Sequence, residues 1–109
     1  MHLAEVVDVM ERIYGRSSAA TVESLMLLES GGLRVAHVDG DIGIEAGALH
    51  GRHYDRKNSA LSMADCVARA TARVLGEPLA TADRALATAA AASGVTIVPL
   101  PDALGRRPA

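Results

Sequence analysis

The stretch LSMADCVARATARVLGEPLATADRAL, residues 61–86, decides the fold because it encodes a helix, a tight turn and a strand in immediate succession. Ser62 is followed three residues later by Asp65, which is a capping box and predicts a helix from Ser62 to Leu75. The segment Gly76-Glu77-Pro78 then ends the helix, since Gly suits the C-terminal position and Pro cannot continue it.

The second half of this stretch predicts a strand and another helix. Leu79 to Ala82 is typical of a short buried strand, and Asp83 suits the N-cap of an Ala-rich helix that stops at Gly94. Val95 to Leu100 predicts a final strand. Because strands alternate with helices, we expect an α/β fold with a short parallel sheet and right-handed crossovers.

Two helices are predicted at the N-terminal end. Apolar residues at helical spacing indicate an amphipathic helix from Leu3 to Tyr14, ended by Gly15, and a second helix from Ser18 to Ser30. The run Leu25-Met26-Leu27-Leu28 makes the second helix apolar on all sides, so a core or a partner must cover it. We expect this surface to support a homodimer.

The middle of the chain is predicted to hold a strand and a helix. Leu33 to Val38 is typical of a strand, and Asp39-Gly40-Asp41 of the turn after it. The segment from Ile42 to about Tyr54 predicts a helix with a glycine at every fourth position, which favours close packing of another helix on that face. These glycines are Gly43, Gly47 and Gly51.

Composition limits the class of protein. The chain has 109 residues, of which 50% are hydrophobic, and a net charge of −2, so we expect one domain at residues 1–101 and a flexible tail at 102–109. Its single cysteine, Cys66, fits a core position in a reducing, cytoplasmic compartment. No apolar run approaches the ~20 residues that span a membrane.

Asp65 and Asp83 are predicted to reach the same edge of the sheet. The helix from Asp65 to Gly76 rises roughly 16 Å at ~1.5 Å per residue. The strand from Leu79 to Asp83 returns roughly 13–17 Å at ~3.3 Å per residue. Two carboxylates at this edge would suit a hard cation such as Mg²⁺ or Mn²⁺, which could activate water and polarise a phosphodiester.

The same two acids have a structural alternative. Asp65 is the third residue of a capping box, and Asp83 is a good N-cap. Asp65 also shares a polar stripe with Arg69 and Arg73, which allows an ordinary ion pair along the helix. Spacing alone therefore leaves the metal site and the capping roles both open.

A resemblance adds to these patterns. The block at residues 61–86 resembles the signature of the PIN domain, in which an "SxxD" helix start and a "TxD" strand end each supply one acid. The segment HLAEVVDVMERIYG, residues 2–15, is similar to the helix of that family that carries a further glutamate, matched here at Glu5. The subgroup it resembles most is the VapC-type toxin of toxin–antitoxin pairs.

The resemblance implies a function and a set of site residues. PIN domains are Mg²⁺- or Mn²⁺-dependent ribonucleases, and VapC-type members are silenced by a small cognate antitoxin. The acids carry over onto Glu5, Asp65 and Asp83, and Thr81 corresponds to the hydroxyl residue that orients metal or water. We expect an RNA substrate, a divalent metal and an antitoxin partner. Periodicity alone places Glu5 on the solvated face of its helix.

The chain departs from the family at its start. The family begins with a buried strand that carries the first metal-binding Asp, followed by a helix, and we expect this βα unit to be absent here. With one ligand fewer, we expect the chain as it stands to be inactive or nearly so on RNA. The alternative function is an inactive PIN remnant that binds an antitoxin or itself. Asp39 or Asp41 could approach the site, but turn and cap roles are favoured.

Basic residues offer candidate RNA contacts. The slightly acidic chain has no general attraction for nucleic acid, so contact requires a local basic patch. Arg52, Arg56 and Lys57 form one run, and Arg84 adjoins Asp83. His50 and His53 are three residues apart on a helix, but without a third ligand they are expected to be exposed polar residues.

Overall fold

The computed structural model describes residues 2–53 and 61–108. Contacts within the chain divide it into two compact units, Met1–His37 and Val38–Ala109. The unit Val38–Ala109 contains the whole of the sheet that the described residues form, together with three of the helices. No helix within the described residues is long and apolar enough to cross a membrane.

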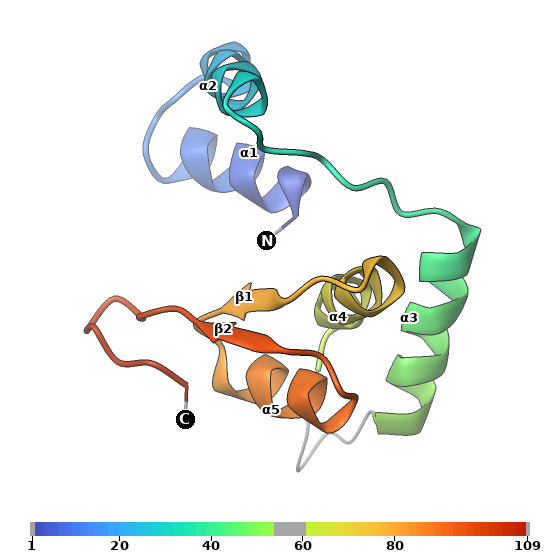
Figure 1. The fold of residues 1–109 in the computed structure, drawn as a ribbon. Helices are drawn as coiled ribbons and strands as arrows, with labels where there is room; N and C mark the ends of the chain where they lie inside the picture. Colours follow the sequence, from blue (N-terminus) through green and yellow to red (C-terminus); the bar gives the residue numbers. More distant parts are fainter. Residues whose placement is uncertain (1, 54–60, 109) are drawn as a thin grey trace. The chain divides into compact units, whose positions relative to one another are not determined.

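The first unit contains two helices, as predicted. They are α1 at Leu3–Arg12 and α2 at Ser18–Ser30, shown in blue and cyan in Figure 1. Gly15 separates them with a φ of 65°, a left-handed conformation that glycine adopts without strain. Ser17 caps α2, since its side chain accepts a hydrogen bond from the backbone N–H of Ala20.

Polar contacts link the two helices of the first unit. The Ser18 hydroxyl donates to Glu11 at 2.9 Å, and Arg16 donates to the carbonyl of Ala20 and to the Ser24 hydroxyl. Thr21 is the one described residue of α1 and α2 that is buried. Three consecutive apolar side chains of α2 are exposed instead: Met26, Leu27 and Leu28.

The connection to the second unit differs from the prediction. Residues 33–39 form no strand, so the strand expected at Leu33 to Val38 is wrong. A strand persists only where a neighbouring strand completes its ladder of hydrogen bonds. Within the described residues the sheet contains two strands, and both lie near the C-terminus.

Helix α3, Gly40–His53, begins where the predicted turn lies. Asp39 accepts a hydrogen bond from the N–H of Ile42 at 3.0 Å, which confirms its capping role, and Asp41 is exposed in the first turn. The glycine face is not a packing face. A Cβ at any of these glycines would meet no described neighbour within 4 Å, so that prediction is wrong: Gly43, Gly47 and Gly51.

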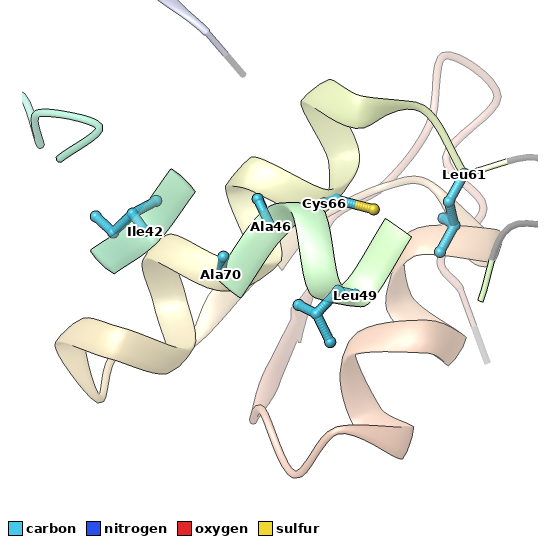
Figure 2. Close-up of a cluster of buried hydrophobic side chains, with 6 residues drawn as sticks. All are labelled: Ile42, Ala46, Leu49, Leu61, Cys66 and Ala70. Carbon is cyan, nitrogen blue, oxygen red and sulfur yellow. The ribbon is translucent and has the colours of Figure 1, made fainter. Parts of the chain in front are cut away.

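Packing uses a different face of α3, directed at α4, Met63–Leu75. Ile42, Ala46 and Leu49 project from α3 at helical spacing, and each is no more than 2% exposed. Figure 2 shows them with their partners from α4 and from the residue before its cap, which are Leu61, Cys66 and Ala70. Because α3 packs on α4 through this apolar stripe, the glycine face beside the stripe makes no such contact with the described residues.

The predicted boundaries of α4 are confirmed. The Ser62 hydroxyl accepts from the N–H of Asp65 at 3.1 Å, and the Asp65 carboxylate accepts from the N–H of Ser62 at 3.1 Å. Both bonds of the capping box are thus formed. At the other end Gly76 adopts a φ of 65° and ends the helix.

A two-stranded parallel sheet follows. Strand β1, Leu79–Thr81, pairs with β2, Ile97–Pro99, so that Leu79 faces Ile97 and Thr81 faces Pro99. Helix α5, Arg84–Ala92, connects them and packs on both strands, while α4 packs on β1 (Figure 1). The predicted α/β class with a short parallel sheet is confirmed.

The core formed by α3 and α4 can be tested with two isoleucines on the same helix. Ile42 is 2% exposed and Ile44 is 74% exposed. We expect Ile42→Ala to lower the free energy of unfolding by about 2–5 kcal/mol, because it leaves a cavity in the core. The same change at Ile44 should alter it by less than about 0.5 kcal/mol. Urea denaturation of both variants measures the difference, and equal effects would contradict this core.

Candidate functional site at the end of strand β1

Thr81 and Asp83 form a hydrogen-bonded turn directly after β1. Thr81 is 8% exposed, and its hydroxyl oxygen accepts a hydrogen bond from the N–H of Asp83 at 3.0 Å. Asp83 in turn accepts from the N–H of Leu86 at 2.8 Å, as the N-cap of α5. One carboxylate oxygen of Asp83 is therefore engaged, and among the described residues the other accepts no hydrogen bond.

Asp65 is held in the same way at the start of α4. Its Oδ2 atom accepts the Ser62 N–H as part of the capping box. Within the part of the chain that the structure describes, Oδ1 accepts no hydrogen bond, and Asp65 makes no salt bridge. Each of the two predicted acids thus combines one capping oxygen with one oxygen left for another interaction.

The ion pair with Arg69 or Arg73 that the polar stripe of α4 would allow Asp65 is not formed. Arg73 instead lies 2.7 Å from Glu45 of α3. Arg69 is 1% exposed and donates to the carbonyl of Ala89 in α5 at 3.0 Å. Because α3 and α5 both pack on α4, more of its surface is buried than its own periodicity indicates.

The burial of Arg69 leaves a charged group incompletely paired. Among the residues that the structure describes, its Nε and Nη2 atoms have no hydrogen-bond partner. Burial lowers the pKa of the Arg69 guanidinium, and the Cys66 thiol and other charges around it act in the second place. Such a group is costly in a protein interior, where buried polar atoms are normally hydrogen-bonded. The sequence pattern does not indicate this burial, since an arginine in a polar stripe ordinarily faces solvent.

Cys66 is part of the core rather than of the site. It is 1% exposed and packs in the cluster between α3 and α4. Burial raises the pKa of the Cys66 thiol, which keeps it protonated and unreactive at neutral pH. The prediction of a core-filling cysteine is confirmed.

Glu5 lies in the other unit of the chain. It is exposed in the first turn of α1, on the solvated face that periodicity predicts. Asp65, Thr81 and Asp83 all belong to the unit Val38–Ala109. The role of Glu5 beside these three residues stays a prediction.

The donor atoms fit a hard divalent cation in type. Asp65 and Asp83 offer carboxylate oxygens and Thr81 offers a hydroxyl, which are the ligands that Mg²⁺ and Mn²⁺ prefer. Among the described residues, no three His, Cys, Asp or Glu side chains stand together as a metal site. A complete ligand set therefore needs a further donor beside the two acids of this unit, and His50 forms no such group with described neighbours.

The predicted basic residues fall in different places. Arg52 is exposed in the last turn of α3, whereas Arg56 and Lys57 lie outside the described residues. Arg84 lines a pocket of about 350 Å³ together with two arginines of the C-terminal segment, Arg106 and Arg107. Arg106 and Arg107 were not among the predicted contacts because residues 102–109 were expected to form a flexible tail. The adjacent pair of arginines was the available signal in the sequence.

These features define a mixed α/β protein with a short parallel sheet and two acids, each at a helix N-terminus. The model of the PIN domain family matches residues 1–92, and the chain belongs to this family. Its fold is PIN-like, as the resemblance predicted. PIN domain membership indicates a nuclease-type function, and PIN domains generally use divalent metal ions. No match was found among curated proteins or among solved structures.

The capping role of Asp83 can be measured separately from any metal role. Asp83→Ala removes the acceptor for the Leu86 N–H, and we expect it to lower the free energy of unfolding by about 1 kcal/mol. Asp83→Asn should leave stability close to wild type, because Asn caps nearly as well as Asp. Thermal unfolding in EDTA compares the three proteins. Equal losses in both variants would show that the negative charge, not the cap, stabilises this end of α5.

Proposed function

We propose that the chain is a metal-dependent endoribonuclease of the VapC toxin type, which hydrolyses RNA phosphodiesters with Mg²⁺ or Mn²⁺. The observation that carries the proposal is that Asp65 and Asp83 make the same kind of contact. Each is fixed by one hydrogen bond to a helix N-terminus and retains one carboxylate oxygen without such a bond among the described residues. Family membership supplies the nuclease class.

The two acids are preorganised to bind a cation, because a helix N-terminus fixes the backbone of each and a capping hydrogen bond fixes one oxygen of each carboxylate. Little conformational entropy would be lost when the remaining oxygens bind an ion. The Thr81 hydroxyl accepts from the Asp83 N–H and still has a proton to donate, so it can orient the carboxylate or a water molecule. A bound ion would activate water and polarise the phosphodiester. Glu5 is the proposed third acid.

The proposed partners follow from the same assignment. They are an RNA substrate, a cognate antitoxin and a second copy of the chain. Arg52, Arg56, Lys57 and Arg84 are the proposed RNA contacts. We place the protein in the cytoplasm, where its single buried thiol at Cys66 would stay reduced.

A second candidate is a non-catalytic PIN domain that only binds an antitoxin or itself. The exposed apolar residues of α2 favour it, because such a surface serves binding whether or not the acids hold a metal. A lack of affinity for divalent cations would be compatible with a binding module, which has no need of the ion. It would not be compatible with the ribonuclease, which cannot act without the ion.

Metal binding is tested by calorimetric titration with Mn²⁺. We expect Asp65→Asn and Asp83→Asn each to weaken Mn²⁺ binding by more than about tenfold. Removing a metal ligand should cost at least as much affinity as removing a group that only hydrogen-bonds to a ligand. RNA cleavage with Mg²⁺ should fall in parallel and stop in EDTA. Asp41→Asn is the matched control, because Asp41 is an exposed acid in the first turn of α3.

Two outcomes would contradict this assignment. Wild-type affinity for Mn²⁺ in both variants would leave Asp65 and Asp83 as caps alone. Metal binding that depends on both acids, without cleavage of any RNA in a structured pool, would favour the non-catalytic candidate over the ribonuclease.

Self-association is tested at the apolar surface of α2. Leu27 is 75% exposed between Met26 and Leu28, and a charge placed there should disrupt an apolar interface. We expect light scattering to show a dimer for the wild type and a monomer for Leu27→Lys. Ile44→Lys, at a side chain that is 74% exposed on α3, should remain dimeric. A monomeric wild type at micromolar concentration would count against the dimer.

A further inference from the structure

The C-terminal segment forms an arginine-lined pocket next to the candidate site. The pocket has a volume of about 350 Å³. Ala82 and Arg84, which flank Asp83 in the sequence, form one side of it, and the C-terminal segment forms the other through Asp102, Arg106, Arg107 and Pro108. Both sides belong to the unit Val38–Ala109. The pocket therefore lies beside an acid that the proposed function places in the metal site.

Asp102 organises the C-terminal side of the pocket. Its Oδ1 atom accepts the N–H groups of Leu104 and Arg106 at 2.8 and 2.9 Å, and Oδ2 lies 2.9 Å from Nε of Arg106. The backbone N–H of Arg106 is the main cause of a lowered pKa for Asp102, so this carboxylate stays ionised at neutral pH. Residues 102–106 thus form a hydrogen-bonded turn that presents the arginines.

The charges around the pocket do not balance. Asp102 compensates Arg106 through their ion pair. Arg84 and Arg107 are exposed, and within the described residues neither has a salt-bridge partner. Among the described lining residues two positive charges therefore remain without a salt-bridge partner, and an anion is the complementary ligand. Guanidinium groups bind phosphate through paired N–H donors.

The lining also indicates which part of a nucleic acid would enter. Among the described residues its apolar members are Ala82 and Pro108, and none of the described lining residues is aromatic, so they offer no ring on which a base could stack. Recognition would rest on charge, which suits the sugar–phosphate backbone and not the bases. An acidic protein segment offers single carboxylates, which match the guanidinium forks but lack the regular spacing of backbone phosphates.

We propose that Arg84, Arg106 and Arg107 bind a backbone phosphate of the RNA substrate and hold the strand next to Asp83. This inference rests on the proposed ribonuclease function and adds a substrate-binding subsite to it. The match to the PIN family ends at residue 92, so Arg106 and Arg107 lie beyond the matched segment. The subsite thus combines Arg84, which lies inside the matched segment, with Arg106 and Arg107, which lie outside it.

The test is RNA binding by the double variant Arg84→Gln/Arg107→Gln. Arg106 is left unchanged because it forms the turn with Asp102. Fluorescence anisotropy of a labelled single-stranded RNA, measured in EDTA over a range of salt concentrations, reports affinity without cleavage. The logarithm of RNA affinity decreases as the logarithm of the salt concentration rises. We expect this decrease to become less steep, by about 0.7 in the slope, for each arginine removed.

Two further variants make the result specific. Arg84→Lys/Arg107→Lys keeps both charges and should keep most of the salt dependence. Arg73→Gln removes the same charge in the last turn of α4, outside this pocket, and should leave the slope as in wild type. Thermal unfolding checks that each variant folds, which the exposure of these side chains favours.

The outcomes separate this inference from the function on which it rests. A wild-type slope in the double variant, with RNA cleavage intact, overturns the phosphate subsite and leaves the ribonuclease proposal standing. If the salt dependence of RNA affinity depends on the arginines but no RNA is cleaved, the result contradicts the proposed ribonuclease function and leaves the phosphate subsite standing. Loss of binding to poly-glutamate with unchanged RNA binding would assign the pocket to an acidic protein segment and overturn the inference.

Discussion

The burial of α4 between α3 on one side and α5 with β1 on the other is the constraint on which the rest of the unit Val38–Ala109 depends. The apolar stripe of α3 covers one face of α4, and Ala72 packs on the other with Ala90 and Val95. Because the contacting side chains are mostly small, the elements approach closely and the packing is sensitive to volume. The same burial encloses Arg69, whose guanidinium is only partly hydrogen-bonded by the described residues.

This packing places the two acids at helix N-termini, where a capping role is compatible with the metal role proposed for them. Asp65 and Asp83 each accept a backbone N–H at a helix N-terminus, where the helix dipole also favours a negative charge. A residue that caps a helix is held in one orientation, which is also what a metal ligand requires. A capping role and a metal-binding role are therefore compatible for these acids. Asn substitutions can distinguish the two roles, because they keep the cap and remove the charge.

Three sequence predictions were wrong for the same physical reason. The Leu33 to Val38 segment has strand-like residues but no neighbouring strand in the described structure. Gly43 and the glycines that follow it form an open face because the adjacent stripe of α3 makes the contacts. Arg69 is buried although its stripe is polar, because α5 covers that side of α4. In each case the outcome depends on a partner far away in the sequence.

The sequence by itself determined the helices, most of their ends and the order of β1, α5 and β2. Capping boxes, N-caps and glycine stops act through hydrogen bonds between residues three or four positions apart, so a local pattern is enough to predict them. It also indicated Asp65, Thr81 and Asp83, since motif spacing is local. Only the tertiary structure decided that Arg69 is buried and that Arg84 meets Arg106 and Arg107. Those contacts join distant segments, and their formation depends on which surfaces the packed helices leave open.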